Sequence, residues 1–321
     1  MGLFSRKFKT FTLPEGTERI EPGAFKGSTD YKEIKIPSSV NYIGAEAFAN
    51  CPYLEKVELP ENISGIYRKV FYNCKSLKKV KISHYVFFIG ESAFENCSSL
   101  EEIVIPPPIM KLDDRAFAGC TNLRRITIAE TVRTLGKNVF ANCTSLTLLK
   151  LPEKLTGIGH SAFLNCTGLK TFVIPATLTF MGHNPFLGCK NLTVTSENEN
   201  YKIEKAFLLD IKKKRVITYF GERPSLILPY GTRRTSDYAF KDNQHLETVI
   251  IPTSTERLGR ETFAGCKSLK EISLYNSINR IDERAFDGCN SLRTILVPIG
   301  CAEKFRTILD KKYWDKIKEI D

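Results

Sequence analysis

The stretch from Leu100 to Leu123 reads LEEIVIPPPIMKLDDRAFAGCTNL, and close variants of it recur along the chain. Its phenylalanine marks a repeat of 23 residues, which stays in register up to one long gap and then resumes. A hydrophobic pattern with a fixed period of about 20–29 residues is typical of a solenoid, in which each repeat stacks on its neighbours. The repeated phenylalanines are Phe25, Phe48, Phe71, Phe94, Phe117, Phe140, Phe163, Phe186, Phe240, Phe263 and Phe286.

Each repeat predicts a strand and a tight turn. Ile103, Val104 and Ile105 alternate inward and outward as in a strand, and Pro106 ends the strand because it has no N–H to donate. The second residue after every repeated phenylalanine is Gly, Asn or Asp, as at Asn96 and Gly119. These residue types tolerate a positive φ. We therefore expect a one-turn helix that ends there.

The buried positions of one repeat cannot be covered within that repeat. Stacking places each side chain beside its equivalent, about 4.8 Å away in a parallel ladder. Nine of the ten cysteines follow a repeated phenylalanine by three residues, and Cys301 is the exception. Equivalent Cβ atoms one rung apart are slightly too distant for a good disulfide, so we expect buried free thiols. There is no C-x-x-C pair, so zinc is not indicated.

The quoted repeat resembles the BspA-like leucine-rich repeats of bacterial and some protist surface proteins, and the resemblance covers residues 10–298. It implies an α/β-type repeat solenoid, right-handed and curved, with a parallel β ladder and short helical turns. It also implies a bacterial surface protein that recognises a protein or glycan, for example in adhesion, rather than an enzyme.

Three irregular parts interrupt the repeats, and we expect residues 1–321 to form a single domain. Residues 1–9 are a short basic lead-in. The spacing from Phe186 to Phe240 is 54 residues, and the intervening segment holds a predicted β-hairpin at about 196–223. We expect the hairpin to project from the stack, because Pro229 keeps its spacing to Phe240. Residues 299–321 have helical spacing, which predicts an amphipathic helix that caps the last rung.

The chain has a formal net charge of +11, which leaves a polyanion or nucleic-acid binder as the alternative function. However, the charges alternate in sign on neighbouring rungs, for instance at Lys32, Glu55 and Lys78, and such charges pair side by side. One cationic cluster stands out at the expected hairpin tip. It comprises Lys212, Lys213, Lys214 and Arg215.

The sequence patterns that resemble ligand-binding or metal-binding motifs have simpler explanations. Gly157-Ile-Gly159-His-Ser-Ala162 matches a dinucleotide fingerprint, but it lies in ordinary repeat positions without the long helix that this fingerprint requires. His160 and His183 occupy one position on adjacent rungs and should lie close together as surface residues. We find no nucleophile–base pattern, metal motif or phosphate loop, so we predict no enzyme, no cofactor and no bound metal.

The outward positions of the strands are the candidate binding surface. From Val104 onward the column ten residues after each phenylalanine becomes apolar or neutral apart from Lys150. Such a row on a rigid surface is a candidate contact patch, although β-branched residues also simply favour strands. The predicted partner-binding residues are Val104, Thr127, Leu148, Lys150, Thr171 and Val173.

The sequence leaves the compartment open. The first residues, Met-Gly-Leu-Phe-Ser-Arg-Lys, contain no apolar signal core, and no segment approaches 18 apolar residues. The family resemblance implies a cell-surface or secreted protein. An exported chain whose signal has been removed and an intracellular protein are both compatible with this sequence, and we expect a monomer without a membrane span.

Overall fold

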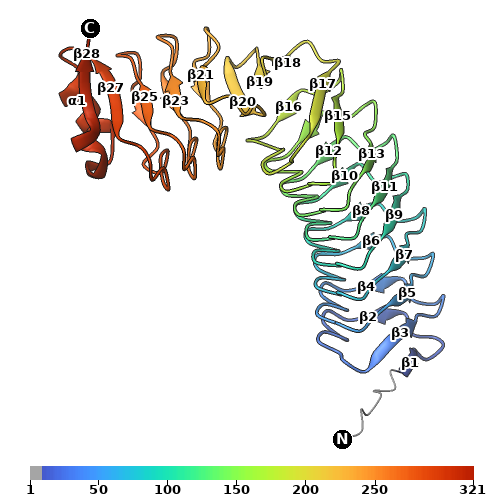
Figure 1. Cartoon of the computed structure of the whole chain (residues 1–321). Coiled ribbons are helices and arrows are strands. Elements are labelled where there is room, and N and C mark those ends of the chain that lie inside the picture. Colours follow the sequence, from blue (N-terminus) through green and yellow to red (C-terminus); the bar gives the residue numbers. More distant parts are fainter. Residues whose placement is uncertain (1–8) are drawn as a thin grey trace, which may run out of the picture. The chain divides into compact units, whose positions relative to one another are not determined.

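The fold is described from a computed structural model, which describes residues 9–321 (Figure 1). The basic lead-in therefore lies, apart from Lys9, outside the described residues. The chain separates into two compact units, Met1–Val194 and Thr195–Asp321, here called unit 1 and unit 2. That the two units function as a single domain stays a prediction.

Unit 1 contains a parallel ladder of strands that we call the strand face. Neighbouring strands pair residues that are 23 positions apart, for example Val104 with Thr127 and Thr127 with Lys150. Inward residues such as Ile103 are buried and the residues between them are exposed, as the alternation predicts. The strands are β1 (Lys9–Thr12), β3 (Tyr31–Lys35), β5 (Lys56–Glu58), β7 (Lys79–Lys81), β9 (Glu102–Ile105), β11 (Arg125–Ile128), β13 (Leu148–Lys150), β15 (Thr171–Ile174) and β17 (Thr193–Ser196).

A second parallel ladder of two-residue strands runs along unit 1. It contributes one buried residue per rung, such as Leu112, which pairs with Ile89 and Leu135 on the adjacent rungs. The two ladders confirm the predicted parallel solenoid. The strands are β2 (Arg19–Ile20), β4 (Tyr42–Ile43), β6 (Gly65–Ile66), β8 (Phe88–Ile89), β10 (Lys111–Leu112), β12 (Thr134–Leu135), β14 (Gly157–Ile158) and β16 (Phe180–Met181).

The segment around each repeated phenylalanine is a series of hydrogen-bonded turns, not the expected one-turn helix. All eleven Gly, Asn or Asp residues two positions after the phenylalanine have positive φ, as predicted. The reason for the difference is that alternate N–H groups bond to the next rung: the N–H groups of Phe48 and Asn50 donate to the carbonyls of Val70 and Tyr72. A helix would have kept these bonds within its own segment.

The core of unit 1 is a column of stacked phenylalanine rings. Phe117 is fully buried, with ring centroids 5.4 Å from Phe94 and 5.8 Å from Phe140. The cysteine column lies beside it, and each thiol donates a hydrogen bond to the carbonyl of the phenylalanine on the preceding rung, as from Cys120 to Phe94 at 3.2 Å. All ten cysteines are free thiols, and Cys189 and Cys301 are only partly buried.

Strand β17 crosses the boundary between the two units after Val194. Unit 2 then contains three antiparallel strands, β18 (Tyr201–Glu204), β19 (Phe207–Asp210) and β20 (Arg215–Tyr219). Strands β19 and β20 form the predicted hairpin, with Lys212–Lys214 in the turn between them, but the prediction that it has two strands only and projects from the stack is wrong. A third strand is present, and every residue of β19 and β20 is buried. Strand β20 pairs in parallel with β22, so the three antiparallel strands cover the first rung of the ladder in this unit. Phe207 and Val216 therefore belong to the hydrophobic core of the unit.

The remainder of unit 2 is again two parallel ladders. One contains β22 (Arg234–Thr235), β24 (Arg257–Leu258) and β26 (Arg280–Ile281) after β20. The other contains β21 (Ser225–Ile227), β23 (Thr248–Ile250), β25 (Glu271–Ser273), β27 (Thr294–Pro298) and β28 (Ile317–Ile320).

The C-terminal cap contains a helix, but a shorter one than expected. Instead of one helix over 299–321, the chain forms α1 (Ala302–Ile308), a 3₁₀ helix η1 (Lys311–Lys316) and strand β28. Phe305 and Tyr313 are buried against the last rung, as a cap requires. Strand β28 pairs in parallel with β27, because the edge of that strand needs hydrogen-bond partners that a helix cannot supply.

Candidate partner-binding surface

The six predicted partner-binding residues are all exposed on the strand face of unit 1. Val104 and Leu148 are about 60% exposed, and Val173 is 47% exposed, which are large values for apolar side chains within strands. Thr127 lies between Val104 and Lys150 in the register of β9, β11 and β13. Val104, Thr127, Leu148 and Lys150 are therefore brought together by one hydrogen-bonded sheet.

Thr171 and Val173 lie one rung further along. Their strand β15 belongs to a separate two-stranded sheet with β17, and it lies next to β13 in the ribbon view (Figure 1). Both residues keep the 23-residue spacing to Leu148 and Lys150. The row of outward side chains therefore continues past the three-stranded sheet.

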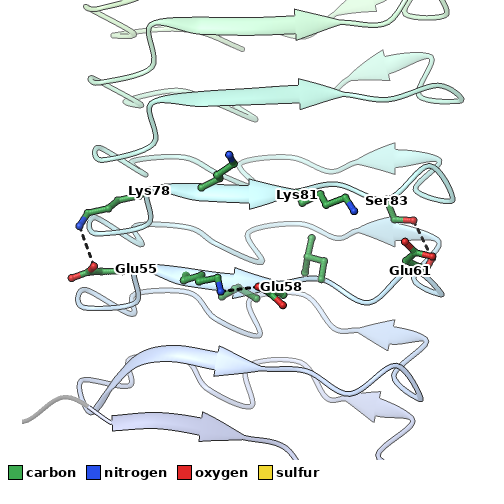
Figure 2. A pocket seen from close by; sticks show the side chains of 10 residues that line it. Glu55, Glu58, Glu61, Lys78, Lys81 and Ser83 are labelled. Atoms are coloured by element: carbon green, nitrogen blue, oxygen red, sulfur yellow. Dashed lines mark hydrogen bonds and ion pairs between the residues drawn. The ribbon is translucent and has the colours of Figure 1, made fainter.

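An open hollow of about 640 Å³ lies on the strand face between β5 and β7 (Figure 2). Its charges largely pair with each other. Figure 2 shows Lys78 directed toward Glu55, at 3.0 Å, and Lys56 contacts Glu58 at 2.7 Å. The hydrogen bond from Lys78 lowers the pKa of the Glu55 carboxyl. The predicted pairing of opposite charges on neighbouring rungs is thus present here.

A second hollow of about 560 Å³ shares Lys78 and Lys79 with the first and extends across β9, β11 and β13. Here the pairing is incomplete. Lys79 reaches Glu102 at 3.5 Å, whereas Arg124 and Arg125 form no ion pair with any of residues 9–321. These two arginines are not among the predicted partner-binding residues. The doublets Glu101-Glu102 and Arg124-Arg125, both in outward positions, were the signal that could have found them.

The second predicted cluster is smaller than expected. Lys212, Lys213 and Lys214 are exposed in the turn between β19 and β20. Arg215 is buried and forms an ion pair with Asp210 at 3.1 Å, so it does not belong to the exposed cluster. The reason is that Arg215 is the first residue of a buried strand and not part of the turn. Burial lowers the pKa of its guanidinium, and Asp210 opposes that shift.

The other predicted features occupy the positions expected of them. The rings of His160 and His183 lie 4.7 Å apart, and the backbone N–H of His183 donates to His160 Nδ1. Gly157 and Ile158 form the short strand β14, which leads into a turn and not into a long helix. No group of three metal-ligating side chains occurs in the described part of the chain. Within that part, no helix has the length and apolar character needed to cross a membrane.

Comparison with solved structures shows similar proteins. A leucine-rich cell surface protein from Faecalibacterium prausnitzii is 26% identical, with a TM-score of 0.63 over 97% of this chain and 91% of that one. A leucine-rich repeat protein from Bacteroides ovatus is 25% identical, with a TM-score of 0.57 over 100% and 94%. A third, from Eubacterium ventriosum, is 19% identical with a TM-score of 0.51 over 84% and 67%, and shows the fold alone.

The sequence itself matches a repeat family. No curated protein matches the chain significantly. The pattern described as "BspA type Leucine rich repeat region" matches in six copies, within residues 3–124, 64–193 and 221–311. These matches cover most of the chain and agree with the ladders, the phenylalanine column and the turns described above. The chain belongs to the BspA-type leucine-rich repeat family.

Proposed function

We propose that this protein is a non-catalytic recognition scaffold that binds a protein or glycan partner through the strand face of unit 1. The observation that supports this most is the row of exposed outward side chains on β9, β11, β13 and β15. The contact residues are Val104, Thr127, Leu148, Lys150, Thr171 and Val173.

A hydrogen-bonded sheet suits this role because its side chains are already in place before binding. Val104 and Leu148 project from β9 and β13, each of which is hydrogen-bonded to β11 between them. A preorganised surface loses little conformational entropy on binding, so more of the interaction energy contributes to affinity. Exposed apolar side chains gathered on one surface are typical of interaction sites.

The proposed setting is the cell surface or the outside of the cell. The similar protein from Faecalibacterium prausnitzii is described as a cell surface protein, and the family is typically non-catalytic. We propose the same location for this chain, with adhesion or surface recognition as its role and a monomer as the binding species.

The alternative is a polyanion binder that uses the overall basic charge of the chain. The exposed Lys212–Lys214 turn favours it. The burial of Arg215 weakens it, because the cluster then presents three cations instead of four. Binding to a polyanion falls steeply as salt concentration rises, whereas binding through apolar contacts does not.

The test compares two double variants of the full chain. Val104→Glu/Val173→Glu places two charges on the strand face. Met110→Glu/Phe180→Glu is the matched control, because Met110 and Phe180 lie in the same two repeats, beside or within the second ladder, and are similarly exposed at 61% and 43%. Both variants should melt within a few degrees of the unaltered protein, since these side chains lie outside the core.

The readout is quantitative capture of surface or extracellular material by the immobilised protein. We expect a captured protein or glycan to be lost with Val104→Glu/Val173→Glu and retained with the control. Equal capture by both variants, together with loss when Lys212–Lys214 are changed to serine, would contradict the proposal and favour the alternative.

A further inference from the structure

The charge of the strand face changes along unit 1. On β3, β5 and the residues before them, the outward positions hold three cations and three carboxylates, namely Lys32, Glu33, Lys35, Glu55, Lys56 and Glu58. On the next five rungs the same positions hold seven cations and two carboxylates, a net charge of +5. These are Lys78, Lys79, Lys81, Arg124, Arg125, Lys150 and Lys170 against Glu101 and Glu102.

Most of the excess cations form no ion pair among residues 9–321. Glu55 pairs with Lys78, and Glu102 pairs with Lys79. The remaining five cations form no ion pair with any residue among 9–321, and all five are exposed. We call them the unpaired cations: Lys81, Arg124, Arg125, Lys150 and Lys170.

The unpaired cations surround the exposed apolar side chains. Arg125 pairs in register with Leu148, and Lys150 lies one rung beyond Thr127, which pairs with Val104. Adjacent rungs are about 4.8 Å apart, well within the distance of about 8 Å over which charges act in physiological salt. One partner surface would therefore meet the positive charges and the apolar side chains together.

We infer that the partner is an acidic protein segment in which apolar side chains lie between carboxylates, and that it docks across β7 to β15. This inference rests on the proposed function and defines its partner class. Arginine suits such a partner because its planar guanidinium binds a carboxylate through two parallel hydrogen bonds. The apolar side chains between the carboxylates would cover Val104, Leu148 and Val173.

A uniformly charged polymer fits this surface less well. Glu101 and Glu102 lie between the lysines of the β7 rung and the arginines of the β11 rung, so a continuous row of negative charge would meet two carboxylates. It would also leave the exposed side chains of Val104 and Leu148 without an apolar counterpart. A protein segment can place its own charges to avoid both costs.

The experiment selects peptides from a displayed random library of 16-residue sequences on the full-length protein and measures the affinity of each for three double variants. Arg125→Glu/Lys150→Glu reverses two unpaired cations, and Val104→Glu/Val173→Glu disrupts the apolar centre. Lys212→Glu/Lys214→Glu is the control, because it changes the net charge of the chain by the same amount in the other unit. Circular dichroism checks that every variant is folded.

We expect the selected peptides to combine Asp or Glu with Leu, Ile, Val or Phe. Both strand-face variants should weaken them by about tenfold or more, and the control by about twofold or less. One result would overturn the acidic partner and leave the proposed function standing. In it, the selected peptides lack acidic residues, their affinity falls with Val104→Glu/Val173→Glu, and it does not change with Arg125→Glu/Lys150→Glu.

Two other results would also overturn the inference. A library that yields no peptide sensitive to Val104→Glu/Val173→Glu overturns the acidic protein segment as the partner, and the capture experiment described above then decides separately whether the proposed function stands. Heparin serves as the polyanion probe. The surface is a polyanion site if heparin binds more tightly than any selected peptide, and if its affinity falls with Arg125→Glu/Lys150→Glu but does not change with Val104→Glu/Val173→Glu.

Discussion

The regular rungs of unit 1 and the three antiparallel strands of unit 2 bury their side chains in different ways. In unit 1, Phe117 packs between the equivalent phenylalanines of the adjacent rungs, Phe94 and Phe140, and the next rung repeats the arrangement. In unit 2, Phe207 packs against Tyr219 and the repeated phenylalanine Phe240, and Asp210 pairs with Arg215. These contacts of the antiparallel strands do not recur at the repeat period. A repeat can cover its neighbour but not the end of a ladder, so the end requires a different element.

Deleting Tyr201–Phe220 tests this comparison most severely. The deletion removes Phe207, Leu209, Val216 and Tyr219 from the core of unit 2. Each buried side chain contributes about 2–5 kcal/mol, and a small unit has about 5–15 kcal/mol in total, so we expect unit 2 to unfold. Limited proteolysis should show rapid cleavage after residue 220, whereas Lys212→Ser/Lys213→Ser should leave the pattern unchanged. A protease-resistant unit 2 would mean that these strands are dispensable.

Phe117→Ala tests the regular stack. Its ring has stacked neighbours on both sides, so we expect a loss of about 3–5 kcal/mol in the free energy of unfolding. Phe25→Ala is the matched change at the start of the array, where the ring is only partly buried, and should cost clearly less. Urea denaturation measures both. Equal losses would argue that the position of a rung in the stack does not matter.

Arg215→Ala tests the non-repeating part. It leaves the carboxylate of Asp210 buried without its partner, which typically costs about 3–5 kcal/mol. Asp210→Leu/Arg215→Met should recover part of that loss, because the unpaired charge is removed. Urea denaturation of Asp210→Leu, Arg215→Met and the double variant provides a thermodynamic cycle. If the double variant is as unstable as the sum of the single changes, the ion pair is not the source of the effect.

Gly119→Ala has a smaller expected effect. Gly119 has a φ of 75°, and a Cβ there would lie 2.2 Å from Asn96 Oδ1. We expect a loss of about 1–2 kcal/mol. Gly119→Asn should cost less, since asparagine tolerates this φ and the equivalent pair Asn142 and Asn165 forms a side-chain hydrogen bond of 2.9 Å. Thermal melting that ranks Asn below Ala would refute this account of the turn.

Glu95 is expected to give the smallest effect. Burial raises the pKa of its carboxyl, but hydrogen bonds from Arg115 and Ser92 outweigh burial and leave the pKa below its ordinary value. A lowered pKa stabilises the fold above the ordinary value of about 4.3, and this stability is lost as pH falls through the folded-state pKa. The urea midpoint of Glu95→Gln should therefore depend less on pH between 5 and 3 than that of Glu15→Gln, an exposed control.

These two regions also differ in how well the sequence predicts them. The spacing of the phenylalanines and the alternation around Val104 were sufficient for the ladders and for the exposure of the strand face, because both depend on repeated local patterns. The extra strand β18, the burial of Arg215 and the short helix before β28 depend on single long-range contacts. Such contacts cannot be predicted from the 23-residue period, because each of them occurs only once in the chain. The pairing of Lys78 with Glu55 followed from the alternating charges, whereas the lack of an ion pair for Arg125 among residues 9–321 became visible only in the structure.

The cysteine column has a further consequence for kinetics. Burial raises the pKa of the Cys97 and Cys143 thiols well above the ordinary value, and raises that of Cys189 to about 12. Only a thiolate reacts readily with an alkylating reagent, so a buried cysteine is modified when its rung opens to solvent. The buried cysteines placed one per rung from Cys74 to Cys166, whose thiol pKa values burial raises, therefore report the opening of their own rungs. Mass spectrometry of their labelling rates would record how often each successive rung of unit 1 opens, without any substitution in the chain.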